Sequence, residues 1–534
     1  MILLITCLSF LAIGPALSLP TAQQPFQVPA FRPSSSSRPS NPHPDLRSED
    51  TPRRKLHVRF LHITDIHPDP HYRVHASESS SCHRKKPKKE EERAGYYGLP
   101  YSDCDSPLRL TNFTLDFLDK HWASEIDFVV CAHDNDRKLP RSLKEIYELN
   151  TAVATKMEDV FLKRGIPVVP SMGNNDVWRK IWSAFIPFPS YQVFQRGAYF
   201  SVEVIPNQVA VLSLNTMYFY DSNKAVGGCE FTERDDPGNL QLDWMEVQLE
   251  MFRSRGMQVW LTGHHVRYVE MALRYQDTIL GHLFGFFFLQ ASDLEFPVDV
   301  AQTGAHDELF DELISDFESL EKSKKKIDLD HFGVVNVAPS VVPNPYLPSF
   351  RVFSYNVSGA SPREEANELK KKRKKGKGQK RKHGPRPPSE DRNASCQRPE
   401  HQNSWRCKLN QPWHTDPSAP SRENGLWSPL GYAQFYLPAG RLANKTRPKF
   451  KLEYLTYALE RLHPEQEGQE FDYPVPLKEL PKGLREPGRL RSKYAPYGLQ
   501  DLTVGSWMGL AGRLGEEKKG GKLRKRFREY MYMG

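Results

Sequence analysis

Four apolar segments of this sequence end in polar residues of the kinds that bind metal ions. The first is HVRFLHITDIH, residues 57–67, in which an apolar strand delivers Asp65 and His67. Side chains two residues apart on an extended chain face the same way, so both can reach one divalent cation. The other three segments are IDFVVCAHDND at 126–136, GIPVVPSMGNND at 165–176 and MQVWLTGHH at 257–265.

The repetition of this pattern predicts a fold class. An isolated Asp-x-His pair is common and carries little information. Several strands that each deliver a polar residue at the carboxyl end are typical of an open α/β sheet with its site along that edge. Helical periodicity at 143–164 and 240–255 precedes the next strand in each case, as a layered α/β order requires. Residues 202–218 are expected to form two further strands joined by a turn.

The motifs DIH, HDNDR, GNND and GH, in this order, resemble those of the calcineurin-like metallophosphoesterases. Within that superfamily the chain is similar to the fungal endopolyphosphatases, which are relatives of acid sphingomyelinase. The supporting segments are FLHITDIHPDPHY (60–72), YYGLPYSDCDSP (96–107), AHDNDRKLPRS (132–142), VPSMGNNDVW (169–178), RYQDTILGHLFG (274–285) and LRKRFREYMYMG (523–534). The resemblance runs from about residue 57 to the C-terminus and implies a β-sandwich flanked by helices that carries two metal ions.

The metal ligands follow from residue types together with this resemblance. Asp65 and His67 would hold one ion, and Asn174 and His264 the other. Two adjacent divalent cations can polarise a phosphoryl oxygen and lower the pKa of a bridging water. Hard oxygen and imidazole ligands suit Mn, Mg, Zn, Co or Fe and do not choose among them.

Two further residues receive a catalytic role from the resemblance alone. His133, in the family's Arg-His-Asp position, would contact the scissile phosphate or protonate the leaving oxygen, and Asp134 would orient its imidazole. His62, His265 and His282 are interpreted as structural.

Three motifs are shorter here than in the family. The strand at 128–132 runs straight into His133, so the family's Gly-Asp, whose Asp bridges the metals, is absent. The proline-containing loop after His264 is missing, and Gly285 runs into Phe286 where the family has another Gly-His block. In-frame losses with intact flanks favour a gene model that has omitted coding sequence. If the sequence is literal, the site lacks its bridge and the chain is a poor enzyme or none.

The resemblance implies internal cleavage of long inorganic polyphosphate into shorter chains. Residue spacing alone does not separate polyphosphate from a phosphodiester substrate. The alternatives are a sphingomyelinase-like phosphodiesterase and a non-catalytic polyphosphate-binding paralogue with a damaged metal site. The absence of an obvious amphipathic lipid-docking segment counts against the phosphodiesterase.

Composition divides the chain into five parts. Residues 1–20 are apolar, and Ala16-Leu17-Ser18 fits a signal-peptide cleavage site, whereas the resemblance implies a signal-anchor and a single-pass type II protein of the vacuolar membrane. The remaining parts are a disordered Ser/Pro-rich lead at 21–54, the metallophosphoesterase domain at 55–360, a basic disordered insert at 361–395 and a family-specific region at 396–534.

Cysteines and glycosylation motifs favour an oxidising, lumenal compartment. The six cysteines after the leader are compatible with disulfides, and the expected local pairs are Cys82–Cys104 and Cys396–Cys407. Four glycosylation sequons are present, at Asn112, Asn356, Asn393 and Asn444.

The basic run KKKRKKGKGQKRKHGPR at 370–386 has two interpretations. It is either a solvated, disordered insert or a cluster that gathers a polyanionic substrate by charge. A nuclear signal would conflict with the leader and the sequons, so no nucleic-acid partner is expected. This run and residues 518–528 supply much of the net charge of +9, so the surface is not expected to be uniformly basic.

Overall fold

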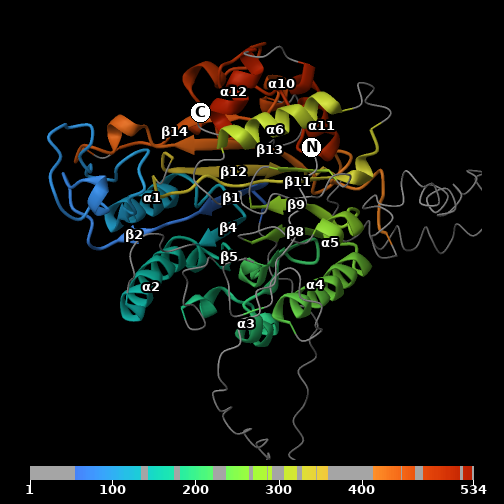
Figure 1. Ribbon diagram of the computed structural model, residues 1–534. Helices are drawn as coiled ribbons and strands as arrows, with labels where there is room; N and C mark the ends of the chain where they lie inside the picture. Colours follow the sequence, from blue (N-terminus) through green and yellow to red (C-terminus); the bar gives the residue numbers. More distant parts are fainter. Residues whose placement is uncertain are drawn as a thin grey trace, which may run out of the picture. The chain divides into compact units, whose positions relative to one another are not determined.

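Two six-stranded sheets form the centre of the fold (Figure 1). The structure is a computed structural model that describes residues 55–133, 142–172, 181–219, 226, 236–263, 269–284, 287–290, 306–320, 327–343, 346–358, 413–446, 448–463, 473–516 and 521–531. Residues 55–534 group as one unit by their contacts. The predicted signal segment, lead and basic insert therefore lie outside the described residues.

The first sheet has the order β14-β13-β12-β1-β4-β5. Its strands are β1 (Arg59–Thr64), β4 (Phe128–His133), β5 (Val168–Met172), β12 (Ser349–Tyr355), β13 (Pro429–Tyr436) and β14 (Lys451–Leu455). β1 pairs in parallel with β4, and β4 with β5, while β12 joins β1 antiparallel from the other side. Strands from the C-terminal region thus complete the same sheet.

The second sheet has the order β10-β11-β9-β8-β7-β6. Its strands are β6 (Phe200–Ile205), β7 (Val209–Ser213), β8 (Gln258–Thr262), β9 (Ile279–Leu283), β10 (Phe287–Gln290) and β11 (Phe332–Val335). β6 and β7 are the two strands predicted at 202–218, joined by a turn in which Asn207 has a left-handed φ of 59°. A third, two-stranded sheet pairs β2 (Pro68–Asp69) with β3 (Ser106–Pro107).

The two large sheets pack face to face through aromatic side chains. Phe60 of β1 stacks on Phe128 and Phe353, with ring centroids 4.6 Å and 4.9 Å away, and meets Trp260 of β8 edge-on at 5.3 Å. Such pairs stabilise a core beyond their buried area. The α/β sandwich is therefore confirmed, and all six residues of β1 are buried as its apolar run predicts.

The expectation of a single open sheet is wrong for β8. β1, β4 and β5 lie together, but β8 pairs with β7 and β9 in the second sheet. An apolar run indicates that a strand is buried, but contacts distant in sequence decide which strand lies beside it.

Helices pack around both sheets (Figure 1). They are α1 (Leu108–His121), α2 (Leu143–Val160), α3 (Tyr191–Gly197), α4 (Pro237–Ser254), α5 (Val269–Arg274), α6 (His306–Ser319), α10 (Leu459–Leu462), α11 (Val504–Glu516) and α12 (Lys522–Met531). Just beyond α1, Trp122 packs on Phe435 of the first sheet, and Leu249 of α4 lies in the core cluster of the second.

Both predicted helices begin at capping residues. Ser142 accepts a hydrogen bond from the Glu145 amide at the start of α2. Asp236 accepts one from the Gly238 amide at the start of α4, and Pro237 occupies the first helical position. These caps satisfy amides that a helix leaves without internal partners. Along the parts of the chain with described structure, no helix combines the length and apolar character needed to cross a membrane.

Candidate active site

The parallel strands β1, β4 and β5 end at one edge of the first sheet. Thr64 pairs with Ala132, and Ala132 with Ser171, so the backbones that follow these residues leave the sheet side by side. Asp65 follows directly after β1, and His133 is the last residue of β4. Three of the four apolar segments that end in polar residues therefore reach one common edge of the sheet, as expected for parallel strands.

Asp65 and His67 converge at this edge. His67 Nε2 lies 3.7 Å from Asp65 Oδ1. The imidazole is buried, with 2% of the side chain exposed, whereas 24% of the Asp65 side chain remains accessible. A buried imidazole and a partly exposed carboxylate on one side of the chain form a donor pair open to a ligand from solvent.

Asp105 orients the His67 ring from behind. Its Oδ1 lies 3.1 Å from His67 Nδ1. The adjacent residue Ser106 binds the His67 carbonyl through its amide at 3.0 Å and its hydroxyl at 3.2 Å. A carboxylate on one ring nitrogen fixes the tautomer and presents the other nitrogen to a metal, the arrangement typical of metal-bound histidines.

The backbone at Asp65 adopts an uncommon conformation. Its φ of 49° lies in the left-handed region, which aspartate tolerates better than most residues. The carbonyls of Thr64 and Asp65 accept hydrogen bonds from the amides of Val341 and Val342, both at 3.0 Å. These contacts hold the turn that directs the Asp65 carboxylate, as is common where a fold positions a functional group.

The described donors fit a divalent metal ion but form only part of a site. A carboxylate oxygen and an imidazole nitrogen backed by a carboxylate are suitable ligands for Mn, Zn, Fe or Mg. No cluster of three or more His, Cys, Asp or Glu ligands occurs among the residues that the structure covers. Asp134, Asn174 and His264, and the side chain of His133, lie outside those residues.

Asp105 is the residue that the sequence interpretation did not assign. It lies in the motif YSDCDSP, next to Cys104, and contacts the ring of His67, which lies 38 positions earlier in the chain. The β2–β3 pairing, in which Pro68 lies opposite Ser106, brings the two segments together. The available signal was an acidic residue beside a predicted disulfide in a family-specific motif.

His62 and His282 are buried in the sandwich. Burial lowers the pKa of His62 to about 3, with a further contribution from the Arg351 guanidinium. Burial also lowers the pKa of His282 to about 3. Both rings are neutral at physiological pH, and it is their burial inside the sandwich that agrees with their interpretation as structural. Asn215, at the end of β7, is also structural, because its side chain binds the Gly197 carbonyl at 3.0 Å.

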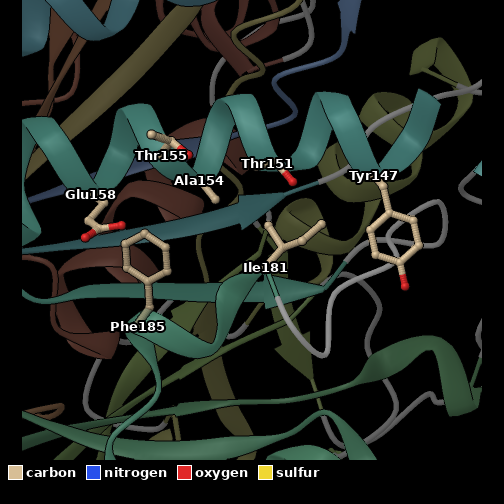
Figure 2. A pocket seen from close by; sticks show the side chains of 7 residues that line it. All are labelled: Tyr147, Thr151, Ala154, Thr155, Glu158, Ile181 and Phe185. Carbon is tan, nitrogen blue, oxygen red and sulfur yellow. The ribbon is translucent and has the colours of Figure 1, made fainter. Parts of the chain in front are cut away.

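A groove of about 370 Å³ lies between α2 and the short helix η3 (Trp182–Phe185). Figure 2 shows the side chains of α2 facing those of the lower segment across the groove. Its lining is Tyr147, Thr151, Ala154, Thr155, Glu158, Ile181 and Phe185. The lining has no cation and one carboxylate, so it does not suit a phosphate ligand and is not part of the candidate metal site.

The structure describes some of the predicted disulfide and glycosylation sites. Cys82 and Cys104 form a disulfide with Cα atoms 5.9 Å apart, while Cys396 and Cys407 lie outside the described residues. Asn112 on α1 and Asn444 are exposed. Asn356 is half-buried and its amide donates to Asn424 at 2.7 Å. Asn393 lies outside the described residues.

Comparison with curated proteins links the chain to several fungal proteins of one name. The endopolyphosphatase of Cryptococcus neoformans var. neoformans serotype D is 36% identical over 661 aligned residues, covering 94% of this chain and 96% of the relative. Those of Candida glabrata and Saccharomyces cerevisiae are each 38% identical, over 48% and 43% of this chain and 44% and 40% of their own lengths. No model of a protein family matches the chain.

Proposed function

Because this chain belongs to the endopolyphosphatase family, we propose that it hydrolyses inorganic polyphosphate by cleaving phosphoanhydride bonds within the polymer. The observation that carries this proposal is the similarity to an endopolyphosphatase along 94% of the chain. The geometry of Asp65, His67 and Asp105 supports it, because a carboxylate beside a buried imidazole that is held by a second carboxylate suits one of the divalent ions that phosphoanhydride hydrolysis uses.

Each predicted site residue would have a distinct task. Asp65 and His67 would hold one divalent ion, with Asp105 fixing the His67 tautomer, and Asn174 and His264 would hold a second. Such ions, when bound, polarise the phosphoryl oxygen and lower the pKa of a bound water. His133, at the end of β4, would contact the scissile phosphate or protonate the leaving oxygen, with Asp134 orienting it.

The proposal also gives a reason for the three shortened motifs, namely that coding sequence has been omitted there. The alignment with the Cryptococcus protein spans 661 positions, more than the 534 residues of this chain, so the relative has segments without a counterpart here. The omission of coding sequence at the three shortened motifs stays a prediction. Sequencing the expressed transcript across codons 125–140 and 260–290 tests it: recovery of the Gly-Asp and Gly-His blocks restores a complete site, and their absence favours a polyphosphate-binding protein without turnover.

We also propose that the protein works in the vacuolar lumen, anchored or released at residues 1–20. The Cys82–Cys104 disulfide supports an oxidising compartment. The exposed sequon residues Asn112 and Asn444 are accessible to glycosylation there. Treatment with a glycosidase should increase the electrophoretic mobility of the purified native protein, and unchanged mobility would contradict this placement.

The full-length protein, expressed from the verified transcript, should shorten long polyphosphate in the presence of Mn²⁺, Co²⁺ or Mg²⁺, as seen by gel electrophoresis of the products. His67→Ala should abolish the cleavage. His75→Asn is the matched control, because His75 is exposed and its left-handed φ of 69° suits asparagine. Full activity of His67→Ala would refute the ligand assignment, and release of single phosphates without shorter polymers would refute internal cleavage.

A further inference from the structure

A loop rich in cations lies next to the candidate metal site. Residues 84–89 have the sequence RKKPKK, and all five cations of this basic loop are exposed. Lys89 pairs with Glu92 at 3.0 Å. Arg84, Lys85, Lys86 and Lys88 form no ion pair with any acid in the described part of the chain. The loop therefore presents four cations whose charge nearby carboxylates do not neutralise.

Two routes connect the base of the basic loop to the site. Cys82 is bonded to Cys104, and the next residue, Asp105, orients His67. His83 Nε2 lies 2.7 Å from Oδ2 of the buried Asp69, two residues beyond His67. The loop is thus attached to the segment that follows His67 and to the segment whose Asp105 orients the His67 ring.

The basic loop has a defined shape. The Arg93 guanidinium donates to the carbonyls of Pro87 at 2.9 Å and Lys88 at 2.7 Å, and the Ser77 amide donates to the Arg84 carbonyl at 3.0 Å. Beneath the loop, Cys82 and Cys104 belong to a small core with Tyr72, Ala76, Ala94 and Leu99. Because the backbone is held, ligand binding has little loop entropy to overcome.

The cations lie a few residues from the contacts that tie the loop to the metal edge. One residue of extended chain spans at most about 3.5 Å, so the Lys86 Cα is within roughly 11 Å of that of His83. The acids that follow, Glu90 and Glu92, are engaged by Arg93 and Lys89, and Glu91 leaves the loop net positive. A run of charge is most often a solvated face, but four of the five cations in this run form no ion pair with a described acid, and the run is held in place and attached to the segments of a predicted phosphate-cleaving site.

We propose that the basic loop is a binding subsite for the polyphosphate chain on one side of the scissile bond. Phosphates beyond the metal site would lie along Arg84, Lys85, Lys86 and Lys88, so a long polymer would gain contacts that a short one cannot make. This inference rests on the proposed function and deepens it, because a subsite that holds chain beyond the cleaved bond favours internal cleavage over release of single terminal phosphates.

The test compares two triple variants of the full-length protein that lose the same charge. K85Q/K86Q/K88Q changes the basic loop, and K120Q/K482Q/R491Q changes exposed cations far from it in sequence, none of which forms an ion pair with a described acid. Binding of fluorescently labelled long polyphosphate is measured by anisotropy in EDTA, so that the readout does not depend on turnover. The loop variant should bind about tenfold more weakly, at roughly 0.5 kcal/mol per lost contact.

Salt dependence and kinetics provide further readouts. The slope of log affinity against log salt should fall by about 2 in the loop variant, since roughly 0.7 counterion is released per contact with a flexible polyanion. KM for long polyphosphate should rise about tenfold with kcat unchanged, while tripolyphosphate turnover stays the same. The control variant should match the wild type in all three.

The outcomes separate this inference from the proposed function. Equal weakening in both variants, or none in the loop variant, overturns the subsite even if polyphosphate is cleaved normally. If the wild type cleaves no polyphosphate with any metal, the proposed function fails, and selective weakening in the loop variant would still support a polyanion-binding loop.

Discussion

Asp105→Asn should weaken metal binding without unfolding the protein. The Asp105 carboxylate accepts from His67 Nδ1 at 3.1 Å and so presents Nε2 toward Asp65. Asparagine keeps the size of the side chain but removes the charge, and its amide nitrogen can turn toward the ring and favour the wrong tautomer. The substitution therefore acts on the metal ligand while leaving its surroundings intact.

The size of the effect follows from the strength of this contact. A hydrogen bond to a charged group contributes about 1.5–3 kcal/mol, which corresponds to roughly tenfold to a hundredfold in an equilibrium constant. Substitution of the carboxylate behind a metal-bound histidine typically costs about 10–100-fold in metal affinity. We therefore expect the half-saturating Mn²⁺ concentration of Asp105→Asn to rise by about tenfold or more.

The assay is polyphosphate cleavage measured against Mn²⁺ concentration after exhaustive dialysis. Asp103→Asn is the control, because Asp103 lies two residues away on the same segment and its backbone amide binds the Glu78 carboxylate at 2.9 Å. A purely structural role of Asp105 would lower the thermal midpoint without moving the metal titration. An unchanged half-saturating Mn²⁺ concentration in Asp105→Asn, with His67→Ala inactive, would refute the reasoning.

Three further predictions concern stability. Asp127→Ala should cost about 3 kcal/mol in urea unfolding, because the buried carboxylate accepts from the Tyr355 hydroxyl at 2.6 Å and from two backbone amides; a loss below about 1 kcal/mol would contradict it. Burial raises the pKa of Glu453 from 4.5 to about 7, so the folded state binds the proton more tightly. Stability from this group is complete below pH 4.5 and is lost as pH rises through 7, by up to about 3 kcal/mol, and Glu453→Gln should flatten unfolding free energies measured across that range. Replacing Cys82 and Cys104 by serine should cost about 2–4 kcal/mol and speed tryptic cleavage in the basic loop, whereas unchanged cleavage would show that the disulfide does not hold the loop.

Local signals in the sequence predicted individual elements well. The apolar residues of β1, followed by Asp65 and His67, predicted a buried strand and two converging side chains, since both properties depend on a few adjacent residues. The helical periodicity at 143–164 and 240–255 likewise predicted α2 and α4, although α4 begins three residues earlier, at Pro237. Resemblance of the whole chain to a family, rather than periodicity, predicted the sandwich.

Properties that depend on distant segments were missed. The apolar run of β8 did not reveal that it pairs with β7 and β9 in the second sheet. The role of Asp105 depends on the β2–β3 pairing, which local periodicity does not report. Asp134, Asn174 and His264 stay predictions, because the structure does not describe them.

The order of strands in the first sheet bears on how this protein is made. β12 pairs with β1 on one side and with β13 along its whole length on the other. On the ribosome β13 emerges long after β12, since residues 356–428 separate them. During that interval the nascent chain exposes an unpaired sheet edge, a template for aggregation. The time between synthesis of β12 and β13 is thus a period in which this chain is prone to aggregate.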